Sequence, residues 1–287
     1  MFLDLNVPYP SHGGDMSELK KTVRLLHQFG YAGAAYTVTV SGKDANKPNP
    51  IKPLKLSELG IPTTQAAERC ASSVSALVSA SPAPPAPFQQ LTRLTVVVDD
   101  IAANYQLNSN NAHLLTYDLI AVQPTSEKLF QAACSVLECD IISLDMSARL
   151  PFFLKAPTVN LALQRGLVFE ISYSAAIRDP TARKNLVSNA AALVRITRGK
   201  GVLLTSDARK AMEVRGVYDV INLASIFSLP QDRAKHALDA TCRAVLLHAA
   251  TRKQIHRGVV AMEPAGTLAQ HDKWKAGVAA ADIAGSS

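Results

Sequence analysis

Residues 117–145 read YDLIAVQPTSEKLFQAACSVLECDIISLD, and this stretch decides the fold class. An apolar run at 117–122 leads through a helical stretch to a second apolar run at 140–145. Such near-continuous runs of Leu, Ile and Val are typical of strands that are buried on both faces of a parallel sheet. A strand, a helix and a second parallel strand form the repeating unit of α/β proteins.

The same unit recurs along the whole chain. Six further strand-like runs are separated by helical stretches: FLDLNV (2–7), AAYTVTV (34–40), RLTVVVD (93–99), LVFEISY (167–173), GVLLTS (201–206) and YDVINLA (218–224). Eight strands that alternate with helices predict a (β/α)8 TIM-like barrel. We expect this barrel to span residues 1–257, with an Ala/Pro-rich insertion at about 66–87 and a loosely ordered tail at 258–287.

Two helices of the barrel carry sequence signals of their own. Asp179 can cap a helix in which Pro180 takes the first position, and the apolar stripe of that helix is Leu186, Ala190, Leu193 and Val194. The buried side expected for the last helix is Ala234, Leu238, Cys242, Val245, Leu246 and Ala249.

The positive charge of the chain is concentrated in one half. The net charge is +7, yet residues 1–148 hold 10 Lys and Arg against 13 Asp and Glu. Residues 149–257 hold 18 against 7, a net charge of +11. Clustered Lys and Arg bind phosphates by releasing counterions, so the asymmetry favours a polyanionic partner. An ordinary solvated face is the alternative that composition leaves open.

A catalytic metal site is not predicted. Asp4 and Asn6 arrive where the first strand ends, and the other acids at strand ends are Asp99, Asp100, Asp145 and Asp207. A metal hydrolase needs several such side chains together with His, but only His12 among the seven histidines comes near a strand end. No H-x-H, H-E-x-x-H, G-x-S-x-G or P-loop motif occurs. We expect no catalytic residue, and a metal-dependent phosphoesterase stays the alternative.

The sequence also bears on compartment. No apolar run approaches the ~18 residues of a membrane span, and the first residues lack the pattern of a signal peptide. Four scattered cysteines without a C-x-x-C pair are typical of reduced, mostly buried thiols. We therefore expect a protein that remains inside the cell and binds no membrane.

Several long motifs resemble one known family. They are LTRLTVVVDD, YDLIAVQPTSEKLFQAAC, RLPFFLKAPTVNLALQRGLVFEISYSAAIRDPTARK, EVRGVYDVINLA and TCRAVLLHAATRK. Together they resemble the TIM-barrel protein subunit of nuclear ribonuclease P and ribonuclease MRP, from DLNVP to about Lys253. The opening DLNVP is similar to the fungal members.

The resemblance implies a non-catalytic RNA-binding and scaffolding subunit. Ribonuclease P removes the 5′ leader of precursor tRNA, and ribonuclease MRP processes precursor rRNA. In such particles the RNA is the catalyst and carries the Mg²⁺, so no cofactor is expected on the protein. The barrel is similar to metal-dependent phosphoesterases, but DLN stands in place of their D-x-H-x-H-type ligands.

The same resemblance implies particular partners and a location. They are the RNAs of both particles, a small α/β subunit of RNA-recognition-like fold, further particle proteins and a second copy of the chain. The implied location is the nucleus, including the nucleolus.

The RNA-binding residues are predicted from the basic half of the chain. Arg178, Arg183 and Lys184 surround the start of the helix at 180, where an anion could offset cations placed at a positive helix N-terminus. Arg149 and Lys155 follow the fifth predicted strand and Arg209 follows the seventh, so all three are expected on the same C-terminal face of the barrel. Arg252 and Lys253, after the last helix, could reach either face, whereas Arg165 and Arg215 are expected on the opposite one.

The motif RLPFFLKAP (149–157) is a candidate protein interface. Its apolar residues Phe152 and Phe153 either plug the barrel mouth or contact another subunit.

Overall fold

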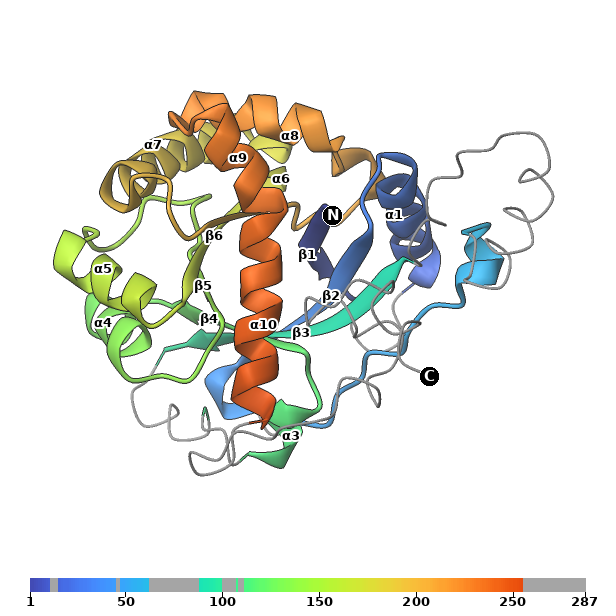
Figure 1. Cartoon of the computed structure of the whole chain (residues 1–287), viewed down its shortest axis with the longest axis horizontal. Helices are drawn as coiled ribbons and strands as arrows, with labels where there is room; N and C mark the ends of the chain where they lie inside the picture. The colour runs from blue at the N-terminus through green and yellow to red at the C-terminus, as the bar shows by residue number, and fades with distance from the viewer. Residues whose placement is uncertain (11–14, 45–46, 62–87, 100–106, 108–110, 255–287) are drawn as a thin grey trace, which may run out of the picture.

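The computed structural model describes residues 1–10, 15–44, 47–61, 88–99, 107 and 111–254 (Figure 1). The predicted insertion at about 66–87 and the tail at 258–287 lie outside the described residues. Seven strands form one parallel sheet in chain order: β1 (Leu3–Pro8), β2 (Gly33–Ser41), β3 (Gln89–Val98), β4 (Leu119–Pro124), β5 (Ile141–Ser143), β6 (Val168–Ser172) and β7 (Val202–Thr205).

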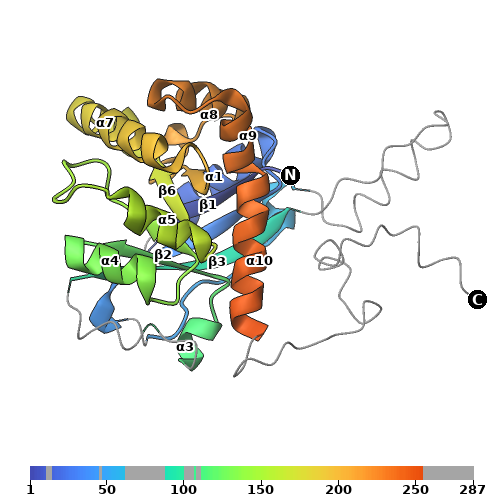
Figure 2. The same ribbon diagram turned by 60° about the vertical axis from the view of Figure 1, so that its left-hand side comes forward.

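Helices surround this sheet (Figures 1 and 2). The α-helices are α1 (Met16–Gln28), α3 (Ala112–Leu115), α4 (Glu127–Ser135), α5 (Ala156–Gln164), α6 (Ser174–Arg178), α7 (Pro180–Thr197), α8 (Val217–Ala224), α9 (Gln231–Leu238) and α10 (Ala240–Gln254). Short 3-10 helices are η1 (Gly42–Asp44), η2 (Leu56–Leu59), η4 (Ala211–Glu213) and η5 (Ser225–Phe227). No helix among the described residues is long and apolar enough to cross a membrane.

The barrel architecture is confirmed, but the predicted eighth strand is wrong. Residues 218–224 belong to α8, whose buried residues Val217, Val220, Ile221 and Ala224 recur at helical spacing. A short apolar run fits a strand and a buried helix equally well, which explains the error.

Because the described part of the chain has no eighth strand, β1 and β7 face each other across the seam of a nearly closed barrel. The Asp207 N–H donates to the Asn6 carbonyl at 2.9 Å. The Ser206 N–H donates to Oδ1 of Asp4 at 3.1 Å. The Asp4 side chain thus takes the place of a ladder partner that a missing strand would have offered.

Alternation along the strands separates an inner from an outer apolar layer. Ile120 and Val122 of β4 pack with the surrounding helices, whereas Leu119 and Ala121 join the inner cluster. The inner cluster gathers residues from the starts of the strands together with Cys242, Val245, Leu246 and Ala249 of α10.

Helix α10 closes the N-terminal end of the barrel. In Figure 1 it crosses in front of the strands, and its Arg252 and Lys253 pair with acids that directly precede β5 and β4. The buried positions predicted for the last helix are confirmed, although the segment is two helices, α9 and α10. The C-terminal ends of the strands are therefore left for function, as in other barrels of this kind.

A buried ion pair ties the middle of the barrel together. Arg93 of β3 and Glu170 of β6 are both fully buried, and the two guanidinium nitrogens Nη1 and Nη2 each lie 2.6 Å from a carboxylate oxygen. Arg93 also donates to the Leu5 carbonyl at 2.8 Å, and the Thr205 hydroxyl donates to Glu170 at 2.8 Å. Burial alone would raise the pKa of Glu170, but the charge and hydrogen bonds of Arg93 outweigh it and lower the pKa.

Removal of one partner of this pair should lower the free energy of unfolding more than replacement of both partners. Glu170→Ala leaves a buried guanidinium without its counter-charge, which should cost roughly 3–5 kcal/mol of unfolding free energy. The double variant Arg93→Met/Glu170→Leu fills the space with apolar groups and should be markedly more stable than the single variant. Urea unfolding followed by circular dichroism measures both. A double variant less stable than Glu170→Ala would contradict this role of the pair.

Candidate nucleic-acid interface

Asp4, predicted where the first strand ends, is instead the second residue of β1 and has a structural role. Its side chain is 2% exposed, and Oδ1 accepts from the Asn6 N–H at 3.2 Å as well as from Ser206 across the seam. Burial raises the pKa of Asp4 to about 6, although the hydrogen bonds from Ser206 oppose the shift. Oδ1 of Asp4 thus helps to close the barrel, while Oδ2 is buried without a hydrogen-bond partner among the described residues.

Each of the other described acids at strand ends accepts a hydrogen bond, lies near an arginine or is exposed. Oδ1 of Asp145 accepts from the Ser147 N–H at 3.0 Å and shapes a turn. Asp207 follows β7 with a φ of 50°, and its Oδ2 lies 4.0 Å from Nη2 of Arg178. Asp99 is exposed after β3. Among the described residues, no group of three or more His, Cys, Asp or Glu could hold a metal ion. His12 and Asp100 lie outside the described residues.

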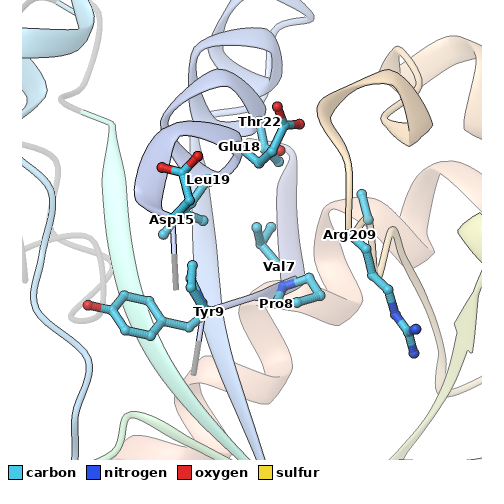
Figure 3. Close-up of a pocket in the computed structure, with 10 residues that line it drawn as sticks. Val7, Pro8, Tyr9, Asp15, Glu18, Leu19, Thr22 and Arg209 are labelled. Carbon is cyan, nitrogen blue, oxygen red and sulfur yellow. The ribbon is translucent and has the colours of Figure 1, made fainter. Parts of the chain in front are cut away.

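A pocket of about 270 Å³ opens where β1 ends (Figure 3). Its walls include Asp15 and Glu18 of the α1 start, with Arg209 on the opposite side. Both acids are engaged: Asp15 caps α1 through the Ser17 N–H, and Glu18 pairs with Lys21 at 2.8 Å. These hydrogen bonds hold the pKa of each carboxyl below its usual value, which is the opposite of what a general acid needs.

Two of the cations predicted to bind RNA have partners within the protein, and their role in RNA binding stays a prediction. Arg178 lies at the end of α6 and donates to the buried Glu213 at 3.0 Å. Nε of Arg183 donates to the Ala176 carbonyl at 2.8 Å. The N-terminus of α7 is capped by Asp179, whose Oδ2 accepts from the Ala182 N–H at 2.9 Å. The Asp179 carboxylate therefore occupies the helix N-terminus, where an anion of the RNA was predicted to bind.

Other predicted cations are available for a ligand. The side chains of Arg149, Lys184 and Arg209 are exposed and form no ion pair or hydrogen bond with the residues that the structure describes. Figure 3 shows the Arg209 guanidinium pointing away from the two acids of the pocket. Lys155 is exposed too, but lies 2.7 Å from Glu127.

Arg252 and Lys253 lie at the other end of the barrel. Arg252 is 7% exposed and binds the buried Asp140, while Lys253 lies 3.0 Å from Asp118. Arg165 donates to the carbonyls at the end of α4, and Arg215 donates to those of its own loop. The structure therefore does not bring Arg252 and Lys253 together with the C-terminal cations, and their role in RNA binding stays a prediction.

The two phenylalanines of the candidate protein interface point in different directions. Phe152 is 7% exposed and stacks on Phe130 at 5.1 Å, so it belongs to the core outside the sheet. Phe153 is 84% exposed. Only Phe153 is free to contact another molecule.

Sequence reasoning missed the residues that organise this face. Oε2 of Glu213 accepts hydrogen bonds from the Arg178 guanidinium and, at 2.9 Å, from the Arg209 backbone N–H. Asn185 and Asn189 donate to the carbonyls of Ser147 and Ala148 and pin the loop after β5 to α7. The i, i+4 spacing of the two amides was the only available signal, and their partners are backbone atoms that no sequence pattern reveals.

The fold and the site define a class of protein: an α/β barrel that carries exposed cations, among them Arg149 and Arg209, after its strands, with no group of metal-ligating side chains among the described residues. The chain belongs to the family of ribonuclease P subunit p30, whose model matches residues 1–254.

Related proteins agree with this assignment. The chain is 36% identical over 261 residues to a probable ribonuclease P protein subunit 3 of Schizosaccharomyces pombe, covering 91% of this chain and 98% of the relative. It is 27% identical to a ribonuclease P/MRP protein subunit of Saccharomyces cerevisiae, covering 91% and 84%. A chain in the cryo-EM structure of archaeal ribonuclease P with mature tRNA has the same fold, with a TM-score of 0.57 at 12% identity over 91% of this chain and 97% of that one.

The structural role of Asp4 predicts a particular pH dependence. Because its pKa rises from a usual value of 3.8 to about 6 on folding, the folded state holds a proton that the unfolded chain has already lost. The contribution of Asp4 to stability is therefore full below pH 3.8 and is lost as pH rises through 6. Asp4→Asn keeps the acceptor for the Ser206 N–H and cannot ionise. Its unfolding free energy relative to the unchanged protein should rise by roughly 2 kcal/mol between pH 4.5 and 7.5.

Urea unfolding of both proteins across this pH range measures the difference. Groups common to both, including Asp207 with its own raised pKa of about 6, largely cancel in the comparison. A difference that stays constant with pH would show that Asp4 does not titrate as a buried seam residue.

Proposed function

We propose that this chain is a non-catalytic, RNA-associated protein subunit of ribonuclease P and ribonuclease MRP. The observation that carries the proposal is the family match over residues 1–254, which includes every described strand and helix. The net charge of +11 on residues 149–257 supports RNA as the partner, since Lys and Arg contacts to phosphates dominate affinity for nucleic acids.

The chemistry of the particle follows from this division of roles. The RNA carries the Mg²⁺ ions and cleaves the substrate, which is precursor tRNA for ribonuclease P and precursor rRNA for ribonuclease MRP. The barrel holds the RNA through cations of its C-terminal face, with Arg149, Lys184 and Arg209 as the side chains free to reach phosphates. A metal-dependent phosphoesterase has only the barrel fold and Asp4 in its favour, and Asp4 is bound to Ser206 and Asn6.

The protein partners are a small α/β subunit of RNA-recognition-like fold and a second copy of the chain. We assign Phe153 to one such contact, because its side chain is 84% exposed and aromatic residues are enriched at protein interfaces. The compartment that fits this function is the nucleus, including the nucleolus.

Affinity purification from nuclear extract tests the proposed function. The tagged full-length chain should bring down the RNAs of both particles together with an activity that removes the 5′ leader of precursor tRNA. Northern hybridisation and a cleavage assay on labelled precursor tRNA are the measurements. As a control, the destabilised Glu170→Ala variant should recover less of both. Purification of the unchanged chain without either RNA would refute the proposal.

A further inference from the structure

The outward face of α7 forms a ridge that the predicted site does not explain. Thr181, Lys184, Ser188, Ala191 and Arg195 are spaced by three or four residues and so share one face of the helix. All are exposed except Ala191, which is partly exposed. The opposite face, with Leu186, Ala190 and Leu193, is buried in the core. We call these five residues the α7 ridge.

Helix α7 is held on both sides of the ridge. On one flank, Nδ2 of Asn185 donates to the Ser147 carbonyl at 3.0 Å and Nδ2 of Asn189 donates to the Ala148 carbonyl at 2.9 Å. On the other flank, Arg183 donates to the Ala176 carbonyl. These bonds fix the rotation of the helix, so the ridge faces away from the protein. They also place Arg149, the residue after Ala148, beside the ridge.

The ridge has the composition of a phosphate-binding surface. None of the 18 residues of α7 is an Asp or Glu. Lys184 and Arg195 form no ion pair or side-chain hydrogen bond with the described residues, and they lie about 16 Å apart along the helix at 1.5 Å per residue. Between them, the side chains of Ser188 and Ala191 are short, so the backbone of a ligand can lie close to the helix.

We propose that the α7 ridge is a docking surface for the RNA sugar–phosphate backbone, read without regard to sequence. This inference rests on the proposed function and adds Ser188 and Arg195 to the RNA contact. Lys184 and Arg195 contact phosphates at the two ends of the ridge, and the small residues between them allow the strand to lie close to the helix. A protein partner would need a large apolar or aromatic anchor, and the ridge has none.

Charge reversal tests the electrostatic part of the proposal. The Lys184→Glu/Arg195→Glu variant of the full-length chain should bind the RNA recovered with the unchanged chain more weakly. The slope of log K against log salt concentration should become shallower by roughly one for each lost cation. Lys52→Glu is the control, since Lys52 is an exposed cation between Asn49 and Leu54, which bond to Thr116 and Gln90 at the N-terminal end of the barrel. It should leave affinity and slope near those of the unchanged chain. Urea unfolding checks that the variants remain folded.

Directed cleavage tests the contact itself. Ser188→Cys carrying Fe(II)–EDTA should cut the RNA of the purified particle at defined positions, and Lys52→Cys with the same group should not. If the RNA co-purifies but no cut arises from position 188 and the charge reversal has no effect, the ridge proposal is wrong while the proposed function stands. Cross-linking of position 188 to a protein would also overturn it. Failure of any particle RNA to co-purify with the unchanged chain is instead a failure of the proposed function.

Discussion

The buried pair of Arg93 and Glu170 is the interaction on which the rest of this barrel depends. Arg93 reaches from β3 to Glu170 on β6 and to the backbone of β1, and Thr205 of β7 adds a hydrogen bond to the same carboxylate. Four strands are thereby tied across the interior at one level. Two buried charges are stable there only because each satisfies the other. These buried polar groups of the barrel interior therefore stabilise the fold.

The same constraint explains how seven strands make a nearly closed barrel. The seam between β1 and β7 is bridged by Asp4 and by the Asn6 carbonyl, which accept N–H groups from Ser206 and Asp207. One oxygen of the Asp4 carboxylate, Oδ1, is used in this way. With α10 covering the N-terminal end, the surface that we assign to RNA is the rim of the C-terminal end and the adjoining face of α7. Binding a backbone along that surface requires charge and shape, and no reactive group.

Much of this architecture could be predicted from sequence. The parallel strands were predicted from their apolar runs. Helix α7 was predicted correctly because its Asp179 cap, its Pro180 and its apolar stripe are all local signals. The strand expected at 218–224 was wrong because seven apolar-rich residues carry no decisive period. The site was harder to predict. Arg178 and Arg183 look like free cations in the sequence, yet they bind Glu213 and the Ala176 carbonyl, which only the tertiary fold brings near them.

The central claim is that this protein binds RNA and performs no chemistry itself. The most direct test compares the purified full-length chain with the assembled particle on labelled precursor tRNA, each with Mg²⁺, Mn²⁺ or Zn²⁺. The account predicts no cleavage by the isolated chain, cleavage by the particle, and loss of that cleavage when a nuclease destroys the particle RNA and is then removed. Sustained turnover by the isolated chain that disappears in Asp4→Ala, with that variant still folded, would contradict the account.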